Sequence, residues 1–192
     1  MFMLQESMNQ PWLADHIQRK AKEHNFTMSC DNLTGSLLRL LISTKPNCKA
    51  LELGTGAGYS TTWLLDGMDH DSLLITVESE EKYINIAKEV ILDRRVDFRV
   101  TDGVDFIKEH LDQKFDLIFA DTWPGKFYLL DEVLGMLKPN GLYIIDDLNP
   151  QPNWPEGHGD KVHKLIEALD QKEDFHILKL DWSTGIMILT KK

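Results

Sequence analysis

The sequence has few cysteines, few basic residues and no long apolar run, and each shortage excludes a class of protein. Two cysteines among 192 residues, Cys30 and Cys48, cannot form a disulfide scaffold, and neither belongs to a metal-binding pattern. Because 21 Lys and Arg stand against 31 Asp and Glu, the formal net charge is −10. Such a charge disfavours binding to nucleic acid or anionic lipid, and no apolar run approaches the roughly 18 residues that cross a membrane. A small molecule is the expected partner.

What is present is the composition of one folded domain. Hydrophobic residues make up 42% and charged residues 27% of the chain, a mixture typical of globular proteins. The N-terminus lacks a basic segment followed by an apolar stretch, so we expect no signal peptide and a cytoplasmic location. We expect a single domain over residues 1–192, with a helical cap over 1–45 and a sheet over 46–192.

Short apolar runs alternate with amphipathic stretches, which is the pattern of βαβ units. The runs predict seven strands: Lys49–Leu53, Leu73–Glu78, Val96–Val100, Phe115–Asp121, Gly141–Asp146, His176–Leu180 and Ile186–Thr190. Apolar stripes between and before them predict helices, including Pro11–Asn25, Asn32–Thr44 and one over residues 127–137. Only Asp181–Gly185 separate the last two strands, so we expect a β-hairpin there. The chain is therefore predicted to be an α/β protein with a doubly wound sheet.

A glycine-rich turn joins the first strand to a helix. Its spacing is G-x-G-x-G over Gly54–Gly58, and Tyr59 stands where a dinucleotide-binding motif needs its third glycine. No Gly-Lys-Ser/Thr follows, so the turn is not a P-loop either. Glu78 closes the next strand, where an acid can accept hydrogen bonds from ribose hydroxyls. Together the turn and Glu78 predict an adenosine-containing ligand.

The run LELGTGAGYS, residues 51–60, resembles the first motif of class I S-adenosylmethionine-dependent methyltransferases. It is most similar to the small O-methyltransferases related to catechol O-methyltransferase and the caffeoyl-CoA enzymes, from about Thr34 to Lys192. The resemblance implies a Rossmann-like seven-strand sheet of order 3-2-1-4-5-7-6 with its last strand antiparallel. It also implies S-adenosyl-L-methionine as cofactor and in-line methyl transfer to the hydroxyl of a small molecule. The implied cofactor-binding residues are Glu52, Gly54, Gly56, Gly58, Tyr59, Ser60, Glu78, Asp102, Gly103 and Asp121.

Each of these residues has an implied place around the cofactor. By the resemblance, Glu52 and the glycine turn would hold the methionine end, Ser60 would bond its carboxylate and Glu78 would hold the ribose. Asp102 and Gly103 would border the adenine. Asp102 also suits the N-cap of a helix that starts near Gly103, and the two roles can coexist.

Acidic residues follow two predicted strands at the edge where ligands bind in such sheets. They are Asp121 on one strand and Asp146 with Asp147 on the other. An acid that closes an apolar strand is costly to bury unpaired, which suggests a cation site. The resemblance implies Mg²⁺ or another divalent cation on these three, although Asp147 replaces the usual Asn and could turn outward. Asp121 has a second implied task, the orientation of the sulfonium or the acceptor.

The position of the catalytic base is left open. The resemblance implies a lysine three residues after the first acid, but that position is Pro124 and the lysine is Lys126. Lys126 is either the base or a solvated residue at the start of the following helix. The family's acceptor-binding acid has no match in the Trp182–Gly185 stretch, so a catechol-like diol is not supported.

The proline-rich segment Asn149–Gly159 is long for a connection in a compact domain, which predicts a lid over the acceptor site. Trp154 would be its wall and His158 a second base or ligand, unless His158 is merely solvated. The sequence does not decide whether the N-terminal helices pair two chains into a homodimer. Two alternative functions stay open: a non-catalytic protein that binds S-adenosylmethionine, and an NAD(P)-dependent oxidoreductase, which Tyr59 disfavours.

Overall fold

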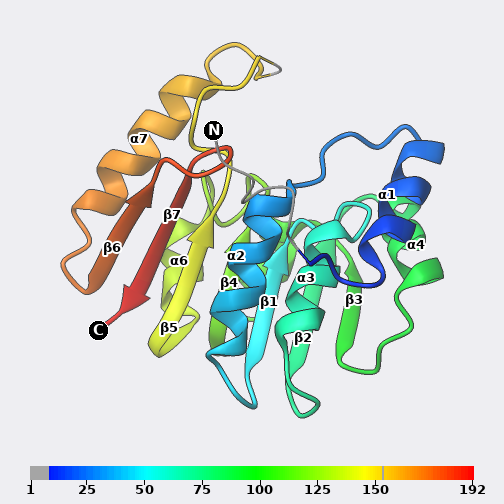
Figure 1. The fold of residues 1–192 in the computed structure, drawn as a ribbon. Coiled ribbons are helices and arrows are strands. Elements are labelled where there is room, and N and C mark those ends of the chain that lie inside the picture. The colour runs from blue at the N-terminus through cyan, green and yellow to red at the C-terminus, as the bar shows by residue number, and fades with distance from the viewer. Residues whose placement is uncertain (1–8, 153) are drawn as a thin grey trace.

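The computed structural model describes residues 9–152 and 154–192, and its helices and strands alternate along the chain (Figure 1). The strands are β1 (Lys49–Leu53), β2 (Leu73–Glu78), β3 (Val96–Val100), β4 (Phe115–Ala120), β5 (Leu137–Ile145), β6 (Phe175–Leu180) and β7 (Ile186–Lys191). The helices are α1 (Ala14–Glu23), α2 (Asn32–Ser43), α3 (Tyr59–Gly67), α4 (Glu81–Val90), α5 (Gly103–Glu109), α6 (Leu130–Gly135) and α7 (His158–Asp170).

The strands form one seven-stranded sheet of order β3-β2-β1-β4-β5-β7-β6, as predicted. β1 pairs in parallel with both β2 and β4, so β1 is an interior strand of the sheet. β7 pairs antiparallel with both β5 and β6, which confirms the predicted hairpin. The carboxyl ends of the five parallel strands meet at one edge, the upper edge in Figure 1. Ligands bind at this edge in doubly wound sheets.

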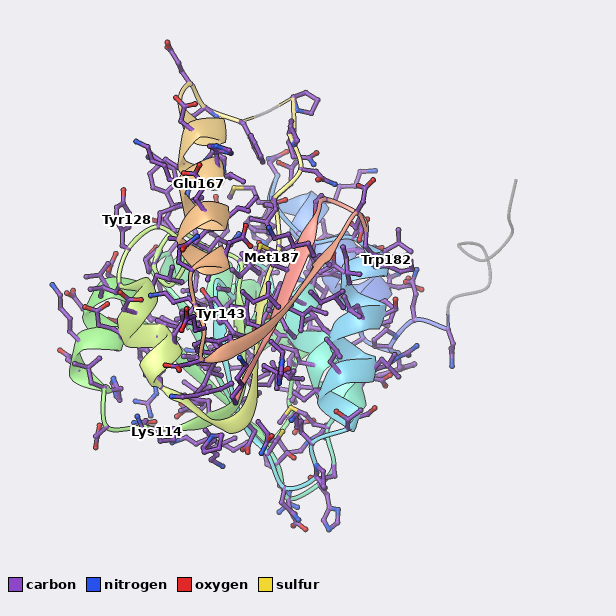
Figure 2. The ribbon with its side chains drawn as sticks, turned by 90° about the vertical axis from the view of Figure 1, so that its left-hand side faces the viewer. Lys114, Tyr128, Tyr143, Glu167, Trp182 and Met187 are labelled. Atoms are coloured by element: carbon purple, nitrogen blue, oxygen red, sulfur yellow. The ribbon has the colours of Figure 1, made fainter. Side chains whose placement is uncertain are left out.

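Helices cover both faces of the sheet and bury an apolar core on each. On one face Leu38 of α2 and Trp63 of α3 pack with Phe119 and Ile144 of the sheet. On the other face α5, α6 and α7 pack on the alternate residues of the same strands. Alternation of this kind follows from the two-residue period of a strand, and it makes β4 and β5 apolar on both sides. Figure 2 shows Tyr143 inside this core and Tyr128 and Trp182 near the surface.

The predicted helix over residues 127–137 is wrong in extent. α6 covers only Leu130–Gly135, because Leu129 has a left-handed backbone with φ 57° that interrupts a helix before it. Leu137 already belongs to β5 and pairs with Phe115, with a bulge before Leu117. The apolar residues of this segment are divided among a turn, the short helix α6 and the start of β5.

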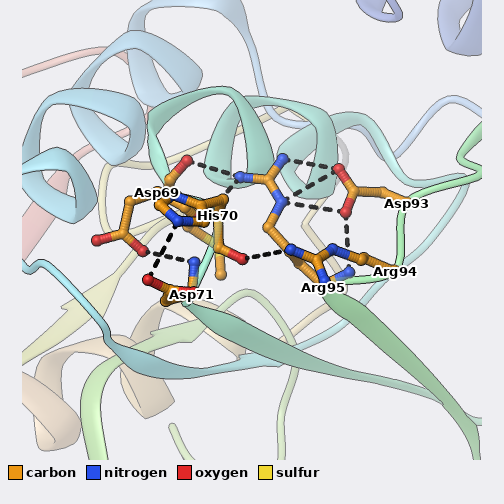
Figure 3. A network of polar contacts seen from close by, with 7 residues as sticks. Asp69, His70, Asp71, Asp93, Arg94 and Arg95 are labelled. Carbon is orange, nitrogen blue, oxygen red and sulfur yellow. Dashed lines mark hydrogen bonds and ion pairs between the residues drawn. The ribbon is translucent and has the colours of Figure 1, made fainter.

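A polar network lies at the opposite edge of the sheet (Figure 3). Arg95, just before β3, pairs with Asp93 at 2.7 Å and donates to the backbone carbonyl of Met68 at 2.6 Å. Arg94 donates to the carbonyl of His70 at 3.3 Å. The network ties the turn before β2 to the turn before β3.

None of the described helices is long and apolar enough to cross a membrane. The expectation about a signal peptide falls largely on residues 1–8, which lie outside the described residues.

Candidate functional site

The glycine turn follows β1 and lies against the ends of β2 and β4. The N–H groups of Gly54 and Thr55 both donate to the carbonyl of Val77, at 3.0 and 3.1 Å. Gly54 has φ +103°, and a Cβ there would lie 2.9 Å from the carbonyl oxygen of Asp121. Only glycine combines that backbone with so close an approach. The turn is therefore held between two neighbouring strands.

A cavity of about 280 Å³ opens beside this turn. Its walls come from the α1–α2 connection, the glycine turn with the start of α3, the end of β2 with the start of α4, and the residues after β4. The lining residues are Phe26, Met28, Ser29, Cys30, Gly54, Thr55, Gly56, Ala57, Tyr59, Ser60, Glu78, Ser79, Glu80, Tyr83, Asp121 and Thr122. The Glu78 carboxylate is held in the wall by the N–H groups of Gly56, at 2.9 Å, and Glu80, at 3.0 Å.

A smaller cavity of about 70 Å³ adjoins the first and shares Gly54, Glu78, Ser79 and Thr122 with it. Asp102 and Gly103, predicted to border an adenine, line this second cavity together with Pro124. Asp102 also caps α5, because its carboxylate accepts the N–H of Val104 at 2.7 Å. The capping prediction is confirmed, and the residue faces the cavity as well.

Glu52 lies behind the turn and is completely buried. Its carboxylate accepts hydrogen bonds from the hydroxyls of Ser60, at 2.5 Å, and of Thr61 and Thr76, both at 2.6 Å. Burial raises its pKa from 4.5 to about 7, against the lowering effect of those three hydroxyls. Glu52 is absent from the residues that line the larger cavity, whereas Ser60 lines it. Contact of Glu52 with a cofactor stays a prediction, and its observed contacts orient Ser60.

The α1–α2 connection closes the cavity on a side that the sequence patterns did not reveal. Phe26 packs edge-on against Tyr83 of α4, with ring centroids 4.6 Å apart, and both rings line the cavity. Burial and the nearby carboxylates raise the pKa of the Cys30 thiol well above its usual value. Tyr59 lines the cavity too, and its hydroxyl donates to the Asn32 side chain. The connection carries no periodicity or motif that could have indicated this position.

Lys126 is buried and lies among the acids at the carboxyl ends of β4 and β5. Its side chain is only 6% exposed, so the interpretation as a solvated residue at a helix start is wrong. Nζ donates to the backbone carbonyl of Asp146 at 2.8 Å and lies 3.8 Å from Oδ1 of Asp121. The sequence interval of five residues therefore still brings the ammonium group beside Asp121.

Burial is the largest influence on both neighbouring acids. It raises the pKa of Asp121 well above its usual value, and the charges of Asp146 and Asp147 raise it further while Lys126 opposes them. The pKa of Asp146 is raised by burial as well, although the Thr184 hydroxyl, which donates to Oδ1, lowers it. Oδ1 of Asp146 also accepts the N–H of Asp147 at 2.8 Å. A raised pKa makes a carboxylate a stronger base.

The predicted divalent cation finds no matching ligand set here. Among the described residues, which include Asp121, Asp146 and Asp147, no group of three or more His, Cys, Asp or Glu side chains could hold a metal ion. Instead one oxygen of Asp146 is engaged by two donors, and an ammonium group lies beside Asp121. Mg²⁺ requires free oxygen ligands at about 2.1 Å. The donor set therefore does not fit the metal in this arrangement.

The predicted lid residues lie beside Lys126. His158 is the first residue of α7, and its ring lies 4.6 Å from that of Trp154 and 5.3 Å from that of Phe127. Burial and the positive charge of Lys126 lower the pKa of His158. In the part of the loop that the structure describes, no residue lines the larger cavity; Asn153 lies outside the described residues. The lid function stays a prediction.

Comparisons with known proteins agree with the fold. A provisionally named O-methyltransferase of Mycobacterium leprae (strain Br4923) is 32% identical over 118 residues, which cover 57% of this chain and 53% of the relative. Another of Mycobacterium sp. (strain KMS) is 32% identical over 140 residues, with 68% and 64% covered. The chain thus spans about half to two thirds of the length of the relatives that it matches.

Solved structures show the same fold at low identity. The O-methyltransferase TomG of Streptomyces achromogenes, in complex with S-adenosylmethionine, has a TM-score of 0.82 and 20% identity, with 97% of this chain and 92% of TomG covered. An O-methyltransferase of Bacillus cereus in complex with S-adenosylhomocysteine has a TM-score of 0.84 and 20% identity, with 97% and 93% covered. The O-methyltransferase family model matches residues 4–191. The chain therefore belongs to the O-methyltransferase family.

Proposed function

We propose that this protein transfers a methyl group from S-adenosylmethionine to the hydroxyl of a small molecule. The observation that carries the proposal is the cavity between the glycine turn and Glu78, in a chain of the O-methyltransferase family. The glycines have no side chains and leave room for the amino-acid part of that cofactor, and the carboxylate at the end of β2 suits the hydroxyls of its sugar. The rings of Phe26 and Tyr83 suit its apolar parts.

The residues of the site have distinct proposed tasks. Bound S-adenosylmethionine supplies an activated methyl group, which an acceptor oxygen takes by in-line displacement so that an O–C bond forms as the S–C bond breaks. Glu78 accepts hydrogen bonds from the ribose hydroxyls. Asp121 lines the cavity and takes the proton of the acceptor hydroxyl, a task suited to a carboxylate of raised pKa. Lys126, held on Asp146, stabilises the negative charge that develops on the acceptor oxygen.

Calorimetric titration tests the binding part of this proposal. Purified protein should bind S-adenosylmethionine and S-adenosylhomocysteine with micromolar dissociation constants, and should not bind NADH. If neither S-adenosylmethionine nor S-adenosylhomocysteine gives a detectable heat of binding, the proposal is wrong. Binding of NADH alone would favour the oxidoreductase alternative.

Turnover is tested separately with a panel of small phenols, catechols and hydroxy acids and a radiolabelled methyl donor. Label should appear in at least one acceptor. Tight cofactor binding without labelling of any acceptor would favour the non-catalytic alternative. The negative charge of the chain leads us to propose small-molecule acceptors in preference to nucleic acid. We propose the cytoplasm as the location, because Cys30 and Cys48 are both free thiols, as is usual in a reducing compartment.

A further inference from the structure

The direction of the Lys126 side chain is set by a tight turn between β4 and α6. Gly125 has φ +87°, and its N–H donates to the carbonyl of Tyr128 at 2.7 Å. The N–H of Lys126 donates to the carbonyl of Trp123 at 3.1 Å. A Cβ on Gly125 would lie 2.7 Å from Cδ1 of Leu53, so the turn lies directly on the sheet. Backbone bonds and packing therefore direct Lys126 inward.

A buried hydroxyl holds the same turn from the other side. Tyr143, completely buried on β5, donates its hydroxyl to the carbonyl of Gly125, the residue before Lys126. Tyr143, which holds the turn, lies on β5, and Asp146, whose carbonyl accepts the hydrogen bond from Lys126, directly follows β5. One segment of the chain therefore positions Lys126 at two points. An arrangement with two buried polar bonds is costly to rearrange, since each broken bond leaves a buried group without a partner.

The acids around Lys126 are arranged for an ammonium group. The carbonyl of Asp146 is occupied by Nζ, and Oδ1 of Asp146 is occupied by Thr184 and by the N–H of Asp147. Asp147 has a left-handed backbone with φ 61° and is half-buried. Asp121 is the nearest carboxylate to Nζ, at 3.8 Å. A divalent ion that joined Asp121 and Asp146 would have to displace the ammonium group from beside Asp121, and at Asp146 it would meet an Oδ1 that already accepts two hydrogen bonds, which leaves Oδ2 as its ligand.

We propose that the ammonium group of Lys126 is the resident cation of this site, so that the protein works without a divalent metal. The inference deepens the proposed function and rests on it only for the role in turnover. A fixed positive charge beside the acceptor oxygen stabilises developing negative charge, which is the electrostatic part of what a metal ion does. Unlike a metal ion, the lysine is covalently part of the chain and is not removed by a chelator.

Binding of Mn²⁺ tests the resident-cation assignment independently of methyl transfer. After removal of metals with EDTA, the wild-type protein is titrated with Mn²⁺ and free Mn²⁺ is measured by electron paramagnetic resonance. The expected result is the same binding curve for the wild type and Asp146→Asn, since any bound ions lie elsewhere on the acidic surface. A wild-type site that Asp146→Asn abolishes would overturn the proposal.

Removal of the ammonium group should create the metal site. Lys126→Ala leaves space beside Asp121 and Asp146, so we expect Mn²⁺ to bind at least tenfold more tightly than to the wild type, and to lose that gain in Lys126→Ala/Asp146→Asn. Lys126→Met fills the space and should show no gain. Lys164→Ala, on the exposed side of α7, is the matched control and should behave as the wild type. Equal Mn²⁺ binding by folded Lys126→Ala and wild type would contradict the proposal.

Turnover supplies the last comparison. In any acceptor assay that detects methyl transfer, the wild-type rate should be the same with excess EDTA and with Mg²⁺. A rate that EDTA abolishes and Mg²⁺ restores would overturn the inference while leaving the proposed function intact. Conversely, a failure to bind S-adenosylmethionine would contradict the proposed function, whereas the Mn²⁺ titrations would still test the assignment of Lys126 as the resident cation. If Lys126→Ala does not fold, the comparison of Mn²⁺ binding by the wild type and Asp146→Asn still tests whether Lys126 is the resident cation.

Discussion

The backbone N–H of Gly56 donates to the carboxylate of Glu78 at 2.9 Å. This bond joins the glycine turn after β1 to the end of β2, the two features that the sequence indicated separately. A second N–H, from Glu80, holds the other oxygen of the same carboxylate at 3.0 Å. Glu78 is thus positioned before any ligand binds, which reduces the entropy lost on binding.

Glu78→Gln should weaken binding of S-adenosylhomocysteine by about 100-fold, or about 3 kcal/mol, because ribose hydroxyls lose a charged acceptor. Calorimetry measures the loss. Glu81→Gln, in the first turn of α4 and exposed, is the control that should bind as the wild type. Unchanged affinity in Glu78→Gln would show that the ribose lies elsewhere.

Gly54→Ala should lower the free energy of unfolding by about 3 kcal/mol and abolish cofactor binding. The new Cβ would meet the Asp121 carbonyl at 2.9 Å in a backbone with φ +103°. Gly157→Ala is a matched control: φ is +75° there, but nothing lies within 4 Å of the Cβ. The control should cost only about 1 kcal/mol of backbone strain. Urea denaturation measures both, and equal losses would contradict the steric argument.

Glu52 should make the stability of the protein fall as the pH rises. Its pKa is about 7 in the folded protein against 4.5 as its ordinary value, so the folded state retains the proton that the unfolded state releases. Between pH 4.5 and 7 the free energy of unfolding should decrease by about 3 kcal/mol, and above pH 7 this contribution should be constant. Glu52→Gln should lack the decrease. Urea denaturation at pH 5 and 8 measures it, and parallel pH profiles would contradict the burial effect.

Tyr143→Phe should reduce kcat while leaving cofactor affinity unchanged. The variant removes the hydroxyl that holds the Gly125 carbonyl, so the turn that directs Lys126 loses one anchor. We also expect a loss of about 1–2 kcal/mol in the free energy of unfolding, from the unsatisfied carbonyl. Tyr128→Phe, at an exposed tyrosine of the same turn, is the control. If Tyr143→Phe has the same kcat as the wild type, the anchor of this turn does not contribute to catalysis.

The strand order of the sheet was implied by the resemblance to the methyltransferase family, and the structure has that order. The residues alone determined the order of the elements, the β6–β7 hairpin and two features that line the larger cavity, the glycine turn and Glu78. These depend on local signals: runs of apolar residues specify strands, glycine spacing specifies the turn after β1, and a five-residue gap specifies the β6–β7 hairpin. The same signals failed at residues 127–137, where apolar spacing is common to a helix, a turn and a strand.

Only the tertiary structure decided how the chemical groups are used. The burial of Lys126, the hydroxyls around Glu52 and the wall formed by Phe26 and Cys30 all depend on contacts between segments far apart in the chain. Thr184, which engages Asp146, comes from the β6–β7 turn. Whether a carboxylate is free to bind a metal depends on which donors reach it and how much water surrounds it, and neither is encoded in local spacing.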